Sequence, residues 1–318
     1  GLLEYAMAKL GVKSVELKFG QAAKGIQGMG RVSKIEDALR FKRLGWLVLP
    51  DPEDTAVAAS HERGEGPHFE KIGRLPMWEA EGLAARVARL RELGAQRVSF
   101  KTGPFAPRDI FLILNIAAEA GVDMVTLDGA GGGTGHSPVR MMDEWGVPAV
   151  NLECAAHRML GSLAAKGITL PQVAIAGGFA TEDQVFKGLA LGAPNIGFVA
   201  VGRAAMAAAM VGRKVGDALA RGEVPKEFAR FGSKVEDVFA DYRLLAADFG
   251  AETATIPTGA IGVFSYLNRL TSGLRMLMAL NRKFSLSLVG REDIVPLTRE
   301  AARVSGLPTY EELTSALL

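Results

Sequence analysis

The chain has 318 residues, of which 48% are apolar and 23% are charged, and its formal net charge is +2. This composition excludes an intrinsically disordered chain, and the interleaved basic and acidic residues argue against a nucleic-acid partner. A single cysteine, Cys154, excludes a disulfide framework and any multi-cysteine metal or iron–sulfur site built by this chain alone. Because no apolar run approaches the roughly 20 residues that cross a bilayer, we expect a cytoplasmic protein without membrane contacts.

Short β-rich runs alternate with helical patterns from residue 12 onward, as they do in parallel βα units. Five runs are predicted as strands, each ending in a polar or glycine-rich loop: Val12–Phe19, Arg97–Lys101, Asp123–Leu127, Gln172–Ala176 and Ile196–Val201. Helices are predicted at Trp78–Leu93, Pro107–Ala120, Cys154–Ala165 and Thr181–Leu191, with an alanine-rich helix after Arg203. The alternation predicts an α/β fold with a parallel sheet.

Two stretches lack this alternation. Residues 51–77 are polar and rich in Gly, Pro, Glu and His, which indicates a long solvated loop. Its histidines, His61 and His68, match no metal-ligand spacing, so we predict no metal site. Beyond Val224 the pattern is helical, with a turn-rich segment near residues 250–262. We therefore predict a barrel-type domain over residues 1–222 and a helical C-terminal extension over residues 223–318.

Cations and glycines gather at the predicted strand ends, which is where the active site of a (β/α) barrel lies. The residues at these ends are Lys18, Lys101, Asp128, Gly177, Gly178, Gly202 and Arg203. Bare glycine backbone and a following helix N-terminus favour a phosphate group, and an arginine adds a charge-assisted contact. The alternative interpretations are that the glycines only relieve backbone strain, that Lys101 is a solvated strand-end lysine, and that Asp128 forms a turn rather than orienting Lys101.

Three motifs carry a resemblance to a known family. Val15–Gly25, with the sequence Val-Glu-Leu-Lys-Phe-Gly-Gln-Ala-Ala-Lys-Gly, resembles a strand and loop of the FMN-binding synthase domain of glutamate synthase. Asp128–Pro138 is similar to that family's Gly-Gly-Thr-Gly-Ala-Ser-Pro loop, and Ala176–Thr181 resembles its Asp-Gly-Gly-x-x-Thr-Gly turn. The order and spacing of the motifs agree with the family from residue 12 to near residue 205.

The resemblance implies a (β/α)8 barrel of the TIM type that binds FMN at its carboxyl-terminal mouth. The implied reaction is hydride transfer from reduced FMN to an imino or keto acid such as 2-iminoglutarate, within glutamate biosynthesis. The implied catalytic residues are Lys18, Lys24 and Lys101. The implied FMN contacts come from Gln21, Lys101, Asp128, Gly132, Gly133, Thr134, Gly135, Gly177, Gly178, Gly202 and Arg203. The implied partners are a dicarboxylate or amino acid, an electron-donor or glutaminase subunit, and further copies of the chain.

The sequence departs from the family pattern in three places. Gly30 stands where the family has a glutamine that contacts the keto acid, and no cysteine follows the last strand to bind the family's iron–sulfur cluster. Electrons would then come from NAD(P)H or from another protein. The match also enters at the family's fourth strand, so only strands four to eight are expected here. Because five strands cannot close an eight-stranded barrel, we expect a C-terminal part of a longer product. The alternatives are a chain that needs a partner and a rearranged sheet edge covered by the C-terminal helices.

Two other functions fit the same residues. A barrel enzyme that acts on a phosphorylated substrate without flavin would use Lys18 or Lys101 as a general base or Schiff-base residue. A partial barrel would instead serve as a non-catalytic subunit or scaffold. Cys154, three residues before His157, is interpreted as a buried structural thiol rather than a nucleophile. His136 is either a proton donor or a residue that stabilises its loop.

Overall fold

The computed structural model describes residues 2–22, 29–73, 79–131, 137 and 139–318. These residues form two compact units. Unit 1 comprises Gly1–Gly178, Leu191–Ala200 and Ile294–Leu318, and unit 2 comprises Phe179–Ala190 and Val201–Asp293. Within the described ranges, no helix combines the length and the apolar character that crossing a bilayer requires.

Unit 1 contains a five-stranded sheet in which the spatial order of the strands follows their order in the chain. The strands are β1 (Ser14–Lys18), β5 (Arg97–Thr102), β6 (Met124–Asp128), β7 (Gln172–Ala176) and β8 (Phe198–Ala200). All neighbouring pairs are parallel. The predicted strands and the α/β class are therefore confirmed, whereas membership of an eight-stranded barrel stays a prediction.

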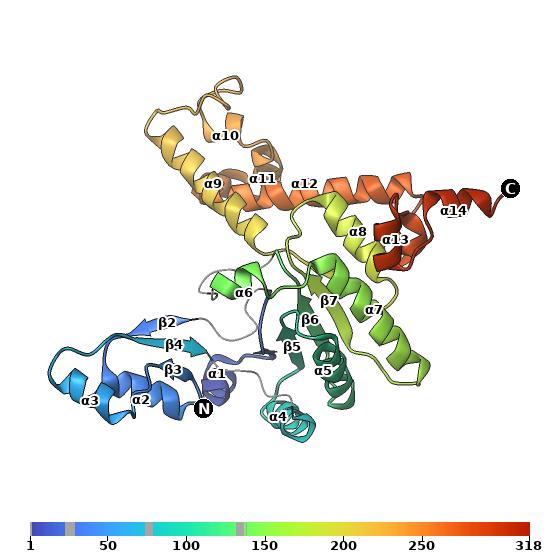
Figure 1. The fold of residues 1–318 in the computed structure, drawn as a ribbon. Coiled ribbons are helices and arrows are strands. Elements are labelled where there is room, and N and C mark those ends of the chain that lie inside the picture. The colour runs from blue at the N-terminus through green and yellow to red at the C-terminus, as the bar shows by residue number, and fades with distance from the viewer. Residues whose placement is uncertain (1, 23–28, 74–78, 132–136, 138) are drawn as a thin grey trace. The chain divides into compact units, whose positions relative to one another are not determined.

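The two faces of this sheet differ in polarity, because successive side chains along a strand point to opposite faces. One face carries the buried apolar side chains Val15, Val98, Phe100, Val125, Leu127, Val173 and Ile175. The helices α4 (Ala80–Glu92), α5 (Pro107–Glu119) and α7 (Ala149–Ala165) lie on one side of the sheet (Figure 1). Helix α4 contacts β5, α7 contacts β6 and β7, and α5 lies against both helices. The opposite face carries mainly polar and small side chains, together with Met124 and Phe198.

The sequence of α5 shows why these helices form where they do. Pro107 occupies the first turn, where its missing N–H is not needed, and Gly121 follows the last residues with a φ of +65° that ends the helix. Between them, Ile110, Ile113 and Leu114 are fully buried at the helical spacing. The helix therefore presents one apolar stripe to the core of unit 1.

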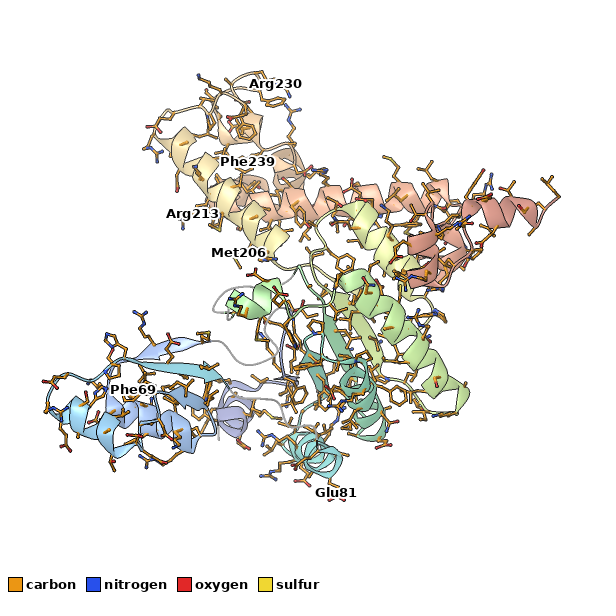
Figure 2. All side chains as sticks on the ribbon, in the orientation of Figure 1. Phe69, Glu81, Met206, Arg213, Arg230 and Phe239 are labelled. Atoms are coloured by element: carbon orange, nitrogen blue, oxygen red, sulfur yellow. The ribbon has the colours of Figure 1, made fainter. Side chains whose placement is uncertain are left out.

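A second sheet of unit 1 is antiparallel and has three strands in the order β2–β4–β3. Its elements are β2 (Gly30–Val32), α2 (Ile35–Arg43), β3 (Leu47–Leu49), α3 (Thr55–Glu62) and β4 (Phe69–Gly73). Phe69, labelled in Figure 2, is fully buried and packs in one cluster with Val32, Ala38 and Val48. This small core sits between short strands and helices.

The prediction of a solvated loop over residues 51–77 is wrong for the residues of this range that the structure describes, because they include α3 and β4. Asp54 begins α3 by accepting hydrogen bonds from the amides of Ala56 and Val57. The His61 ring stacks on Phe69 with the ring centroids 4.6 Å apart, so it is not a loop side chain in solvent. Strands this short bury few side chains. The sequence of the small sheet is therefore mostly polar and shows no periodic apolar pattern.

The remaining elements of unit 1 are four short helices, α1 (Leu2–Leu10), α6 (Val139–Asp143), α13 (Arg299–Ser305) and α14 (Tyr310–Ser315). Nη1 of Arg158 on α7 donates a hydrogen bond to the carbonyl oxygen of Val304 on α13, at 3.1 Å. This contact ties the C-terminal segment of the chain to the helices of the main sheet.

Unit 2 is helical. It contains α8 (Glu182–Gly192, whose last two residues fall in unit 1), α9 (Arg203–Ala220), α10 (Val235–Val238), α11 (Tyr242–Phe249), η1 (Gly250–Thr255), α12 (Thr258–Leu280), η2 (Leu286–Leu288) and η3 (Arg291–Asp293). Helices α9 and α12 pack along each other (Figure 1), and Phe239, labelled in Figure 2, joins a core with Val215, Leu245 and Ile261. The predicted domain boundary at residue 222 falls inside this unit and stays a prediction.

The turn-rich segment predicted near residues 250–262 needs a correction. It contains η1 and the first turn of α12. Gly250 ends α11 with a φ of +55°, but Gly262 serves a helix contact. A Cβ at Gly262 would lie 2.5 Å from the carbonyl oxygen of Ala208, and one at Gly212 on α9 would lie 2.6 Å from that of Thr258. The bare α-carbons let α9 and α12 approach closely.

Candidate functional site

Two lysines stand side by side at the carboxyl edge of the main sheet. Lys18 on β1 and Lys101 on β5 are register partners. Residues opposite each other on neighbouring strands point to the same face, with about 4.8 Å between the strands. Like charges at this spacing repel each other, so the pair is stabilised by any anion that approaches this face. The sheet therefore presents a cationic position on its polar face.

Asp128 supplies a negative charge beside one of these lysines. Its Oδ2 atom lies 3.2 Å from Nζ of Lys101, and the two side chains are 8% and 22% exposed. Lys101 is in register with Thr126, so Asp128 is its diagonal neighbour two residues further along β6. The contact favours the interpretation in which Asp128 orients Lys101 over the one in which it only forms a turn.

The loop that follows β1 folds over the same edge. Nζ of Lys18 donates a hydrogen bond to Oε1 of Gln21. The amide of Phe19 donates to the carbonyl oxygen of Lys101 at 2.8 Å, and the amide of Ala22 donates to that of Asp128 at 2.9 Å. The loop thus runs from β1 past β5 to β6, and it brings Gln21 to the cationic position.

Ala22 is a site residue that the sequence analysis missed. It is fully buried and has a φ of +41°, a conformation that alanine rarely adopts. The sequence could not predict this buried position with a positive φ, because alanine is not a residue type that favours it. Thr126, 8% exposed, was missed as well, although its position two residues before Asp128 on a strand places it on the same face.

The glycines after β6 and β7 bring two backbones into contact. Gly177 has a φ of +126°, and a Cβ there would lie 2.6 Å from the carbonyl oxygen of Gly129. Gly131 has a φ of +94°, and its Cβ would lie 3.5 Å from the α-carbon of Gly178. Packing and backbone conformation therefore account for the glycine at position 177, as the strain-relief alternative proposed. Gly178 is exposed, with a φ of +86°.

Gly202 differs from these glycines. It precedes α9 in unit 2 with a φ of −118°, outside the left-handed region that favours glycine. A Cβ there would meet no atom of the described chain within 4 Å. Neither packing among the described residues nor a positive φ requires a glycine at this position. Arg203, the first residue of α9, is exposed.

Five of the predicted site residues lie outside the described residues: Lys24, Gly132, Gly133, Thr134 and Gly135. His136 lies outside them as well. Cys154 is 1% exposed within α7, which confirms its interpretation as a buried thiol. Nearby, Nδ1 of His157 lies 3.1 Å from the carbonyl oxygen of Gly192.

These observations define an α/β protein whose parallel sheet carries paired cations, a buried carboxylate and closely packed glycine loops at its carboxyl edge. Residues 74–213 match the family described as the conserved region in glutamate synthase. The predicted resemblance is therefore confirmed over this segment, which includes Lys101, Asp128, Gly177 and Gly202 but not Lys18 or Gln21.

The chain is also similar to individual proteins that are named as glutamate synthases or as glutamate synthase-like. The chain is 29% identical over 191 residues to an archaeal-type glutamate synthase [NADPH] of Dehalococcoides mccartyi, which covers 59% of this chain and 34% of the relative. It is 26% identical over 311 residues to a glutamate synthase large subunit-like protein of Rhizobium meliloti, which covers 93% of this chain and 62% of the relative. The chain thus spans about a third of the first relative and less than two thirds of the second.

Solved structures resemble the chain only weakly. One of them is the flavin-binding domain of baker's yeast flavocytochrome b2, with 15% identity and a TM-score of 0.42. The alignment covers 99% of this chain and 55% of the flavocytochrome chain. Neither the function nor the closure of the barrel follows from a likeness at this level.

Proposed function

We propose that the chain is an FMN-dependent oxidoreductase of the glutamate synthase type that reduces an imino or keto acid such as 2-iminoglutarate. The observation that carries the proposal is the cluster of Lys18, Lys101 and Asp128 at the carboxyl edge of the sheet. The family match over residues 74–213 supports it, because the segment contains two members of this cluster.

The charge of the described lysines suits a flavin. FMN, when bound, supplies hydride transfer and develops negative charge at the N1–C2 edge of its ring on reduction. Lys101 stabilises an anion at the edge of the sheet, and Asp128 fixes its Nζ in one orientation. Gly178, exposed and without a side chain, leaves its backbone accessible to a phosphate. Gly202 and Arg203 remain phosphate contacts implied by the resemblance.

The substrate proposal rests on the lysines of the first strand and loop. Lys18 attracts a carboxylate by its charge, and its hydrogen bond to Gln21 limits the positions of its Nζ atom. Lys24 is proposed as a second carboxylate contact from the resemblance. Gly30, which replaces the family's glutamine, begins β2 and pairs with Lys71 in the small sheet. The proposal therefore specifies a dicarboxylic imino or keto acid without assigning the keto-group contact.

The electron supply is proposed to come from outside the chain. Its one cysteine is buried in α7, so this chain does not build the family's iron–sulfur centre. We propose NADPH, which the name of the Dehalococcoides relative specifies for that protein, or an electron-donor protein. A glutaminase subunit or free ammonia would provide the nitrogen.

The test is flavin binding followed by substrate reduction. The chain is titrated into FMN while flavin fluorescence is recorded, and we expect saturable quenching. Lys101→Gln should weaken the affinity by tenfold or more, whereas Lys166→Gln, at an exposed lysine after α7, should leave it unchanged. Bound flavin reduced with dithionite should then be reoxidised by 2-oxoglutarate with ammonium.

Two outcomes would overturn the proposal. The first is a chain that does not quench FMN fluorescence at any concentration. The second is a covalent adduct on Lys18 or Lys101 after borohydride treatment with a phosphorylated keto compound, because such an adduct identifies the Schiff-base enzyme instead.

A further inference from the structure

An open groove of about 990 Å³ lies in unit 2 between α9 and the first turn of α12. Helix α9 contributes Met210, Val211, Arg213, Lys214 and Asp217 to its lining, and Arg221, the residue after α9, contributes as well. From α12, residues 257–260 contribute only small side chains, Pro-Thr-Gly-Ala, so they leave the groove unfilled. The function proposed above does not use this groove.

The centre of the groove is apolar and exposed. Met210 and Val211 are 66% and 57% exposed, and Met206, one turn earlier on α9, is 60% exposed. Met206 and Arg213 are labelled on α9 in Figure 2. Flexible methionine side chains adapt to apolar groups of different shapes, which suits them to a binding surface. Covering these side chains would remove apolar area from water.

Cations follow these apolar side chains along the chain. Lys214 has no ion pair with any described residue, while Nε of Arg213 lies 3.9 Å from Asp217 and Nη2 of Arg221 lies 2.9 Å from Glu223. Lys214 is exposed, and the four paired side chains are each more than half exposed. Surface ion pairs of this kind are weak enough to exchange for a better partner. With three cations and one carboxylate in its lining, the groove is complementary to an acidic ligand.

We propose that this groove binds an acidic amphipathic helix of a partner protein. Arg221, which directly follows the last residue of α9, is seven residues after Lys214, a spacing of about 10 Å along a helix axis. A partner helix therefore meets them with two carboxylates seven residues apart and places an apolar side chain against Met210, one turn beyond the carboxylate that faces Lys214. Asp217 lies between the two cations and repels a third acid there. This central carboxylate and the apolar floor disfavour a nucleic-acid backbone.

The experiment uses the full chain and a fluorescein-labelled helical peptide of 16 residues, about four turns. The peptide is built on alanine, with glutamates seven residues apart and leucines three and four residues outside each of them. We expect saturable binding by fluorescence anisotropy. Lys214→Gln/Arg221→Gln should weaken it by tenfold or more, and so should replacing the peptide's glutamates by glutamine. Met210→Gln should weaken it less strongly.

The matched control is Lys226→Gln/Arg230→Gln, which removes the same charge from exposed positions of unit 2 outside the groove. Equal weakening by this control would show attraction by overall charge and overturn the proposal. So would absence of saturable binding, or tighter binding to phosphatidylglycerol vesicles than to the peptide. Sedimentation of the chain alone tests whether a second copy covers the groove, and a dimer broken by Lys214→Gln/Arg221→Gln would replace the proposed partner. None of these measurements requires flavin.

Discussion

Nζ of Lys101 lies 3.2 Å from Oδ2 of Asp128, across a diagonal between the parallel strands β5 and β6. This ion pair compensates one of the two neighbouring lysines on the polar face. The other, Lys18, has its hydrogen bond to the neutral amide of Gln21. Two lysines thus stand at this edge, and their charges attract an anionic ligand.

Asp128→Asn should destabilise unit 1 by about 1–3 kcal/mol, because a charge-assisted contact is lost while Lys101 stays largely covered. Urea unfolding followed by the fluorescence of Trp145 measures this, since every tryptophan of the chain lies in unit 1. In a double-mutant cycle, Lys101→Met should remove most of the effect of Asp128→Asn. Additive effects would show that the two charges do not interact.

Gly177→Ala and Gly202→Ala should behave differently although both glycines follow a strand. Alanine at position 177 requires a φ of +126° and brings a Cβ within 2.6 Å of the carbonyl oxygen of Gly129. We expect a loss of about 2–4 kcal/mol of unfolding free energy there. Alanine at position 202 meets no described atom within 4 Å, so its stability should match the parent chain.

The FMN titration completes this comparison. Gly202→Ala should weaken FMN binding in a chain of unchanged stability, as expected for a position whose bare backbone serves a phosphate. If Gly202→Ala neither destabilises the chain nor changes FMN affinity, the glycine has no part in the cofactor site.

The main sheet could be predicted from the sequence because its strands are apolar on one face and are separated by long helical patterns. Gln172–Ala176 has the predicted bounds, and the other strands differ by at most two residues at either end. The small sheet could not be predicted, because β2 and β3 have three residues each and the segment 51–77 is polar. One buried aromatic residue, Phe69, organises its core, and a single residue leaves no periodic signal.

The candidate site was predictable in its charged residues and less so in its glycines. Lys18, Lys101 and Asp128 end strands, so the topology of a parallel sheet brings them to one edge. The glycines at positions 177, 202 and 262 lie in three different environments. Gly177 has a positive φ and packs against a neighbouring loop, Gly202 is an open position, and Gly262 lies in a close contact between helices. These environments depend on which backbone passes nearby, and the sequence does not specify that neighbour.

Acid should weaken the sheet at its opposite edge through Asp123. Its Oδ2 accepts hydrogen bonds from the amide of Val98 at 2.6 Å and from Nη2 of Arg91 at 2.7 Å. Burial raises the pKa of Asp123, but the hydrogen bonds from Val98 and Arg91 outweigh it and hold the pKa below its usual 3.8. A carboxyl group with a lowered pKa stabilises the folded state above its unfolded pKa, and this contribution disappears as the pH falls through the folded value.

Asp123→Asn should therefore destabilise unit 1 at neutral pH, by about 1 kcal/mol since the side chain is partly exposed and solvent screens it. The difference between the parent chain and the variant should shrink below about pH 4. Urea titrations at pH 7, 5, 4 and 3 measure it. A difference that stays constant across these pH values would mean that the ionised carboxylate does not contribute.

Gly262→Ala should destabilise unit 2, although alanine is the better helix former by about 1 kcal/mol. The new Cβ would lie 2.5 Å from the carbonyl oxygen of Ala208, so α12 must move away from α9 or the methyl group must clash with that backbone. We expect a net loss of about 1–3 kcal/mol. Gly82→Ala in α4 is the matched control, because its Cβ would meet only Glu79 at 3.9 Å, and it should be neutral or stabilising. Thermal unfolding by far-ultraviolet circular dichroism follows both variants. Stabilisation by Gly262→Ala would show that the two helices do not need this close approach, since helix propensity would then be the larger effect.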